Sequence, residues 1–111
     1  MMNDKQNKAL QVLYECAIAC DQCFNGCLQE QDVKMMTNCI RLNVECAQIC
    51  RTTATLIAQD VSYIEEMAEV CSDICAACAR ECEQHEHEHC KVCAEVCRRC
   101  EEVCDEYGGA L

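Results

Sequence analysis

In the segment Cys90-Lys-Val-Cys93-Ala-Glu-Val-Cys97-Arg-Arg-Cys100-Glu-Glu-Val-Cys104, five cysteines recur at steps of three, four, three and four residues. An α-helix has 3.6 residues per turn, so this spacing places all five sulfur atoms along one seam of a helix. Val92, Val96 and Val103 each precede a cysteine and widen the seam into an apolar stripe. The segment therefore predicts a helix that buries its thiols against partner helices.

Three further segments repeat this pattern. Residues 16–27 and 71–82 each carry four cysteines at steps of four, three and four, and in residues 39–50 Asn43 takes the place of a fourth cysteine. The first and third segments keep a constant offset along the chain, and so do the second and fourth. This regularity predicts a duplicated helical hairpin, with copies at about residues 4–58 and 61–107.

The composition favours an all-α fold. The chain has no proline and three glycines, so few residues would interrupt a helix or build the turns of a sheet. A length of 111 residues suits one core of moderate size. We therefore expect a single domain, residues 1–111, folded as an antiparallel up-down-up-down four-helix bundle with a cysteine-lined core.

Capping signals predict where the helices of the first hairpin begin and end. The first helix is expected to start from an N-cap at Asn3 or Asp4 and to run to about Glu30. After a short polar connection, Asp32 is expected to cap a second helix that continues to Ile57.

In the second hairpin, Asp60 or Ser62 is the expected N-cap, because Ser62-Tyr-Ile-Glu65 has the pattern of a capping box. The third helix is expected to end near Glu83. The fourth follows a turn containing three histidines and is expected to end at Tyr107, before the glycines at positions 108 and 109.

Charge and targeting signals narrow the cellular setting. The formal net charge of −11 repels phosphate backbones and anionic lipid heads, which argues against nucleic-acid and membrane-surface partners. The first residues lack the apolar segment of a signal peptide, and no run of 18 apolar residues could span a bilayer. We therefore expect a cytoplasmic protein, whose sixteen cysteines stay reduced and are better suited to metal binding than to disulfides.

The kind of metal follows from ligand softness and charge. Thiolates select Cu(I), Zn(II) and iron-sulfur clusters, but four thiolates around one zinc leave two surplus negative charges, which are costly to bury. Cu(I) at about one ion per thiolate gives a neutral assembly. Storage or sequestration of many Cu(I) ions is the favoured function, and we expect no enzyme activity. A zinc- or cadmium-sequestering protein and a disulfide-stapled helical structural protein remain the alternatives.

The cysteine seams, the segment Cys39-Ile-Arg-Leu-Asn-Val-Glu-Cys46 and the segment His85-Glu-His-Glu-His-Cys90 resemble those of the cytosolic four-helix-bundle copper storage proteins. The resemblance covers nearly the whole chain. It implies a homotetramer that stores many Cu(I) ions. Apart from the resemblance, a copper chaperone is a further candidate partner. The resemblance also implies that the seam cysteines are the metal ligands: Cys16, Cys20, Cys23, Cys27, Cys39, Cys46, Cys50, Cys71, Cys75, Cys78, Cys82, Cys90, Cys93, Cys97, Cys100 and Cys104.

Several other residues are candidate auxiliary ligands. Met36 and Asn43 occupy the positions that correspond to Cys90 and Cys97 in the second hairpin, and thioether sulfur also binds Cu(I). The remaining candidates are the histidines of the last turn and an adjacent methionine: His85, His87, His89 and Met35. An exposed acidic turn and a gap-filling methionine pair are the plainer interpretations of these residues.

The two ends of such a bundle should differ. We call the end where the first hairpin turns the histidine end, because Cys27, Met36, Cys39, Cys82 and Cys90 should gather there beside the three histidines. At the opposite, apolar end the seams continue into residues without thiols: Ala9, Leu13, Thr53, Ile57, Ile64, Ala68 and Tyr107. We expect copper to enter through the histidine end.

Overall fold

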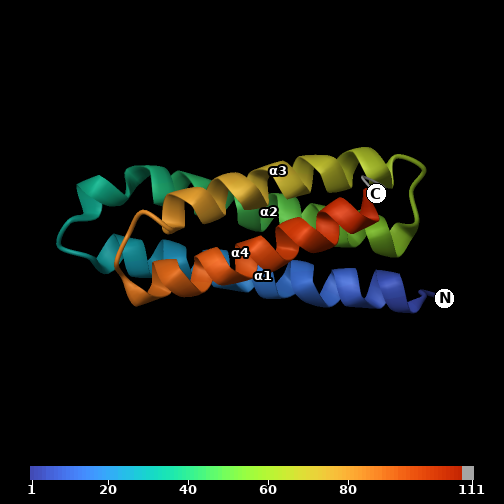
Figure 1. Cartoon of the computed structure of the whole chain (residues 1–111), viewed down its shortest axis with the longest axis horizontal. Helices are drawn as coiled ribbons and strands as arrows, with labels where there is room; N and C mark the ends of the chain where they lie inside the picture. Colours follow the sequence, from blue (N-terminus) through green and yellow to red (C-terminus); the bar gives the residue numbers. More distant parts are fainter. Residues whose placement is uncertain (109–111) are drawn as a thin grey trace.

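The computed structural model describes residues 1–108 and has four long helices packed side by side (Figure 1). This arrangement confirms the predicted all-α four-helix bundle. The elements in chain order are α1 (Asp4–Gln29), the 3-10 helix η1 (Val33–Met36), α2 (Thr37–Gln59), α3 (Ile64–Cys82) and α4 (Glu88–Tyr107).

Each long helix packs against two others, so the bundle has a square cross-section. The contacts join α1 with α2 and α4, and α3 with α2 and α4. Short connections make consecutive helices antiparallel, and both ends of the described chain lie at the same end of the bundle (Figure 1). The molecule measures 46 × 23 × 18 Å, and its long axis follows the helices. All four predicted seams can therefore face one central axis.

The start of α1 agrees with the sequence. Asn3 is the N-cap, its side chain accepts a hydrogen bond from the backbone N–H of Gln6, and the Gln6 side chain accepts one from the N–H of Asn3. This reciprocal pair is a capping box, which satisfies two N–H groups at the helix start. The helix ends at Gln29, one residue before the expected Glu30.

The start of α2 differs from the prediction. Asp32 makes no capping hydrogen bond, and one 3-10 turn, which contains Met35 and Met36, precedes the α-helix at Thr37. The Asp32 carboxylate lies instead 3.3 Å from Nε2 of His87 on the facing connection. A contact between two connections that are distant in the sequence has replaced the expected local cap.

The predicted capping box at Ser62 is wrong. The α3 helix begins at Ile64, and its N-cap, Tyr63, makes no side-chain capping bond. Asp60 ends α2 in the left-handed conformation, with φ 55°, which aspartate tolerates better than most residues. The reversal of the chain therefore occupies Asp60 to Tyr63, and the helix can start only after Ser62.

The α4 helix ends at Tyr107, as predicted, with Gly108 as its C-cap. Gly108 has an ordinary negative φ of −72°, which residues other than glycine also adopt. A Cβ at this position would lie 3.2 Å from the carbonyl oxygen of Cys104 and 3.6 Å from Cβ of Ala68 on α3. The contact with Ala68 is an ordinary van der Waals distance, so the packing of α4 on α3 at this point does not depend on the glycine. The expected role of Gly109 lies outside the described residues.

The core contains few large aliphatic side chains. Leu13, Met36 and Ile57 are the largest buried apolar residues, and the rest of the interior is mostly cysteine and alanine. Among residues 1–108, no helix is long and apolar enough to cross a bilayer. The single domain and the duplicated hairpin remain predictions from the sequence.

Candidate metal centre

All four helices turn their cysteine seams toward the central axis. Fifteen of the sixteen cysteines have no exposed surface, and Cys104 is 2% exposed. Every one is a free thiol in the structure. The seams therefore line the interior along much of its length, as the helical spacing predicted.

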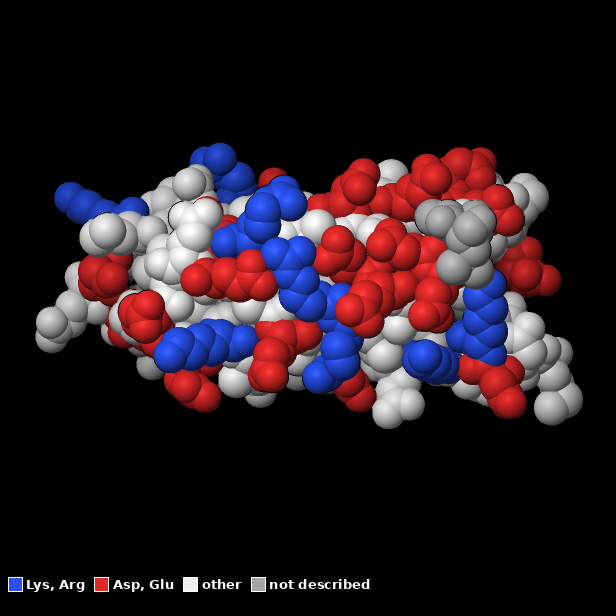
Figure 2. Space-filling model, viewed as in Figure 1, with Lys and Arg blue, Asp and Glu red and all other residues white. Residues whose placement is uncertain are grey.

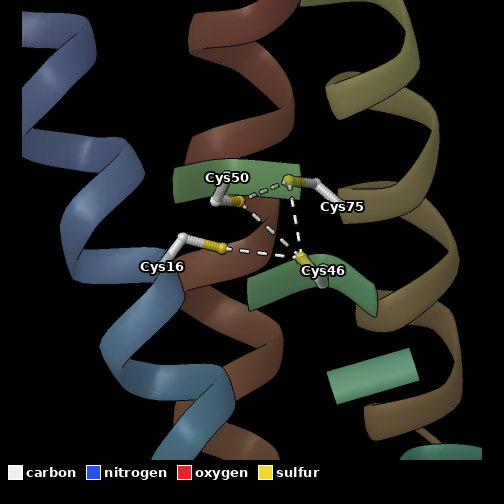
Figure 3. A group of neighbouring side chains, drawn as sticks. All are labelled: Cys16, Cys46, Cys50 and Cys75. Carbon is white, nitrogen blue, oxygen red and sulfur yellow. Dashed lines mark hydrogen bonds between the residues drawn. The ribbon is translucent and has the colours of Figure 1, made fainter. Parts of the chain in front are cut away.

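The sulfur atoms lie close together without being bonded. In the group shown in Figure 3, Cys46 on α2 lies 4.0 Å from Cys16 on α1, 3.9 Å from Cys50 and 3.8 Å from Cys75 on α3. A disulfide has a sulfur–sulfur distance of about 2.05 Å, so these contacts are between separate thiols. The geometry favours a metal-binding interior over a disulfide-stapled structural core.

The thiols gather in groups of four that could each hold a soft metal ion. Within each group, all sulfur atoms lie within 4.8 Å of one another. Five of these groups are Cys16, Cys46, Cys50 and Cys75; Cys16, Cys20, Cys46 and Cys97; Cys20, Cys78, Cys93 and Cys97; Cys50, Cys71, Cys75 and Cys100; and Cys23, Cys27, Cys39 and Cys90. Several groups share members, so neighbouring ions could be bridged by common thiolates.

Asn43 lies among the thiols, as its position in the seam of α2 predicted. It is fully buried. Its amide oxygen accepts hydrogen bonds from the thiols of Cys78, at 3.5 Å, and Cys93, at 3.7 Å. Its amide nitrogen donates to Cys39, at 3.7 Å. The side chain is thus a polar lining group with both of its functions paired to sulfur.

At the histidine end, Cys23, Cys27, Cys39 and Cys90 form the outermost thiol group. Nδ1 of His89 lies 3.5 Å from the sulfur atoms of both Cys23 and Cys90. The side chain of His89 is 21% exposed, so it connects the buried thiols with the solvent. This arrangement agrees with the expectation that one end of the thiol array carries an imidazole.

The other two histidines do not reach the thiols. His87 stacks on His89 with ring centroids 5.4 Å apart, and it lies 3.3 Å from the carboxylates of both Glu30 and Asp32. His85 pairs with Glu81, at 2.8 Å. Of the three candidates, the structure brings only His89 into contact with sulfur.

The two candidate methionines also separate. Met36 is fully buried at the histidine end, where the pattern of the seam placed it. Met35 is 74% exposed. The structure therefore places Met36, but not Met35, in the lining of the interior.

The thiols at the histidine end have unequal acidity. Hydrogen bonds from Cys39 and other neighbours, including His89, lower the pKa of Cys23 below its ordinary value. Burial raises the pKa of Cys27 to about 12, and burial also raises the pKa of Cys90. Cys27 and Cys90 are therefore protonated and neutral at neutral pH.

The apolar end is closed as predicted. Ala9, Leu13, Thr53, Ile57 and Ala68 are all at most 1% exposed, and Ile64 and Tyr107 pack against this group at its edge. The hydroxyl of Thr53 has no hydrogen-bond partner among the described residues. No thiol or imidazole within residues 1–108 belongs to this plug.

The sequence pattern did not indicate the roles of two residues at the histidine end, Glu30 and Gly26. Glu30 accepts a hydrogen bond from Nε2 of His89, at 2.7 Å, and so orients the imidazole toward Cys23. Gly26 leaves room for the same ring, because a Cβ there would lie 2.6 Å from Cδ2 of His89. An isolated glycine inside an otherwise regular helix was the available signal for Gly26.

These features define a class of protein: a helical bundle that sequesters soft metal ions through thiols buried on its axis. The model of the copper storage protein family matches residues 2–109. The chain therefore belongs to the copper storage protein family. A storage role for the family agrees with the prediction that the chain is not an enzyme.

Individual relatives agree with this assignment. A cysteine-rich protein of Bacillus subtilis strain 168, described as uncharacterized and called YhjQ, is 37% identical over 90 residues, which cover 81% of this chain and 83% of the relative. The Cu(I)-bound copper storage protein BsCsp3 superposes with a TM-score of 0.89 at 36% identity, covering 93% of this chain and 97% of its own. A cytosolic copper storage protein of Streptomyces lividans, with five coppers, superposes with a TM-score of 0.92 at 37% identity. The match covers 97% of this chain and 95% of the relative.

Proposed function

We propose that this chain stores many Cu(I) ions on the sixteen thiols that line its interior. The observation that carries the proposal is the continuous burial of free thiols at contact distance: sulfur atoms from all four helices lie in groups within 4.8 Å of one another. The solved relatives support it, since one is a Cu(I)-bound copper storage protein and another carries five coppers.

The chemistry of uptake is an exchange of protons for copper. The interior is neutral when its thiols are protonated, and it stays neutral if each Cu(I) replaces one thiol proton. Zinc or cadmium on four thiolates would leave two negative charges per ion inside the bundle. Because unpaired buried charge is costly, this geometry favours Cu(I) over both divalent ions.

The sixteen cysteines are the proposed ligands, and the auxiliary groups have different places in the process. His89 contacts two thiols and the solvent, so it is the proposed first ligand for incoming copper. Met36 and Asn43 line the interior and offer weaker ligands there. His85 and His87 pair with carboxylates and contribute through the polar surroundings of the entrance.

The location, oligomeric state and protein partner of the chain are also proposals. A cytosolic location suits thiols that must stay reduced, and the relative from Streptomyces lividans is described as cytosolic. We propose that the chain forms a homotetramer. The half-exposed Tyr14 and Ile18 lie one turn apart on α1 and would supply apolar surface for the contact between copies. Sedimentation equilibrium measures this state directly. A copper chaperone is the proposed partner for delivery and removal.

An air-free titration of the fully reduced protein with Cu(I) tests the proposal. We expect thiolate-to-copper absorption in the ultraviolet to rise until about one copper is bound per cysteine, roughly 12 to 20 ions, because neutral clusters need similar numbers of ions and thiolates. A thiol count before the titration excludes disulfides, and parallel titrations with Zn(II) and Cd(II) provide the comparison. A break at about two to four ions would contradict storage and indicate discrete structural sites.

A further inference from the structure

Two residues at the end of α1 hold the ring of His89. Gly26 leaves the space that the ring occupies, since a Cβ there would lie 2.6 Å from its Cδ2. Glu30, the C-cap of α1, follows four residues later, and its carboxylate accepts a hydrogen bond from Nε2 at 2.7 Å. The end of α1 therefore fixes both the position and the rotation of the imidazole.

The hydrogen bond to Glu30 also decides which ring nitrogen carries the proton. A carboxylate oxygen accepts hydrogen bonds and cannot donate them, and a neutral imidazole has one N–H and one nitrogen with a free lone pair. With the proton on Nε2, the lone pair lies on Nδ1. That nitrogen faces the thiols of Cys23 and Cys90, at 3.5 Å from each sulfur atom.

Nδ1 and the two sulfur atoms form a triangle of nearly the size that a three-coordinate Cu(I) ion requires. The sulfur atoms of Cys23 and Cys90 lie 3.9 Å apart, and each lies 3.5 Å from Nδ1. In a planar trigonal site with metal–sulfur bonds of about 2.3 Å and a metal–nitrogen bond of about 2.0 Å, these separations are about 4.0 and 3.7 Å. An ion can therefore bind with little movement of the side chains, provided that the lone pair is on Nδ1.

We propose that Glu30 is a positioning residue for copper entry: it keeps the proton of His89 on Nε2, so that Nδ1 is free to bind the first Cu(I) ion. A carboxylate behind a metal-binding histidine commonly has this effect. Glu30 acts through His89, since its hydrogen bond is to the ring nitrogen that does not face the thiols. The inference rests on the proposed function, in which His89 is the first ligand for copper.

Glu30 also contacts a second histidine. Its carboxylate lies 3.3 Å from Nδ1 of His87, whose Nε2 lies 3.3 Å from the carboxylate of Asp32. The contact with His89 is shorter, at 2.7 Å, and only His89 reaches the thiols. The experiment must therefore separate an action through His89 from an action through His87.

The direct test is the rate of Cu(I) uptake by reduced, metal-free protein, measured by stopped-flow absorbance under air-free conditions with Cu(I) supplied as its acetonitrile complex. Loss of such a carboxylate typically costs about 10–100-fold in metal affinity or activity, so Glu30→Ala should slow uptake about tenfold. Glu30→Gln keeps an oxygen that accepts the same N–H and should restore most of the rate. An unchanged rate in Glu30→Ala would overturn the inference, and so would an equal loss in Glu30→Gln, which would assign the effect to charge alone.

Double variants test the route of the effect. In a His89→Ala background, Glu30→Ala should slow uptake no further, because the ring that it orients is absent. In a His87→Ala background, the full effect of Glu30→Ala should remain. Additive losses in the first background, or loss of the effect in the second, would overturn the inference.

Glu81→Ala is the matched control. Glu81 pairs with Nε2 of His85 at 2.8 Å, and within residues 1–108 that ring contacts no thiol, so the uptake rate should not change. A slowing as large as in Glu30→Ala would show that the loss of any carboxylate at this end is sufficient. Circular dichroism confirms that each variant is folded.

Nitrogen-15 NMR of the His89 ring provides a readout that a purely structural role would not change. The neutral ring of the wild-type protein should carry its proton on Nε2, and the Nδ1 resonance should shift when one equivalent of Cu(I) is added. In Glu30→Ala, part of the proton population should move to Nδ1. A proton that stays on Nε2 in this variant would contradict the proposed role.

The copper capacity distinguishes this inference from the proposed function. Each variant keeps all sixteen cysteines, so the capacity should stay near one copper per cysteine. Full capacity with an uptake rate that does not depend on Glu30 would overturn the inference and leave storage intact. A capacity of about two to four ions in the wild-type protein would overturn storage itself.

Discussion

Gly26 shows how one residue can make room for His89 at a cost to its own helix. A glycine inside a helix is about 0.5–1 kcal/mol less stable than an alanine there. The structure explains why the position has no side chain: the His89 ring occupies the space a Cβ would need, 2.6 Å from Cδ2. The same ring contacts the thiols of Cys23 and Cys90.

The substitution Gly26→Ala should therefore have opposite effects on stability and on uptake. We expect the His89 ring to swing away from Cys23, so that Cu(I) uptake slows as much as in His89→Ala. The free energy of unfolding should fall little or rise by up to about 1 kcal/mol, because alanine favours the helix. Stopped-flow uptake and urea unfolding measure the two effects.

The double variant Gly26→Ala with His89→Ala is the decisive comparison. If both changes act through the same imidazole, the double variant should load copper no more slowly than either single variant. Asn25→Ala, at an exposed neighbouring position of α1, is the control and should leave the uptake rate unchanged. Additive losses of rate would show that Gly26 acts by another route.

At the scale of the elements, the four seams are alike in the middle and different at the ends. The connections at the histidine end carry imidazoles, carboxylates and the buried Met36, whereas Leu13 and Ile57 close the apolar end. A soft ion finds ligands at the first end and hydrocarbon at the second. Copper should therefore enter and leave the bundle only at the histidine end.

Replacing the candidate residues of the histidine end by alanine or leucine should slow copper uptake and the removal of copper by a chelator about tenfold, which corresponds to about 1.4 kcal/mol in the barrier. The copper capacity should stay unchanged. The set comprises His85, His87, His89, Met35 and Met36. The structure predicts that His89 alone accounts for most of the effect, since it contacts sulfur and Met35 is exposed. Stopped-flow absorbance measures both rates.

Leu13→Ala at the apolar end is the contrasting variant. It should lower the free energy of unfolding by about 2–5 kcal/mol, because Leu13 is fully buried, and leave the rates unaltered. Rates that are insensitive to the histidine-end substitutions but rise in Leu13→Ala, Ile57→Ala or Ile64→Ala would assign the entrance to the apolar end.

At the scale of the molecule, the surface charge is uneven. Figure 2 shows acidic side chains gathered over the part of the bundle formed by the start of α3 and the end of α4, while basic side chains are interspersed elsewhere. The exposed acids of these segments are Glu65, Glu66, Glu69, Asp73, Glu102, Asp105 and Glu106. The net charge of −11 repels other anions, most strongly at low salt.

The metal-free protein should already be folded. Neutral thiols behave as small apolar groups, and they pack in the interior together with alanine, Leu13 and Ile57. We expect the far-ultraviolet circular dichroism of reduced, metal-free protein to show the full helical signal, with Cu(I) raising the unfolding temperature by mass action. A random-coil spectrum that becomes helical only with copper would show that the bundle's own core is too weak to fold.

The spacing of the cysteines determined the fold class, the number of helices and the face each helix buries, because steps of three and four residues set an angular position around a helix axis. It also indicated a soft metal, since thiol softness belongs to the residue itself. Local capping signals were reliable at Asn3, where both partners lie within one turn, and failed at Asp32 and Ser62, where tertiary contacts and the left-handed Asp60 prevailed.

Only the tertiary structure decided how the helices sit against one another along the axis, because sequence spacing carries no information on axial register between helices. That register selects His89, and not His85 or His87, as the imidazole beside the thiols. It places Asn43 among thiols of α2, α3 and α4. It also brings Gly26 under an imidazole 63 residues further along the chain, a steric relation that exists only once α1 and α4 have packed.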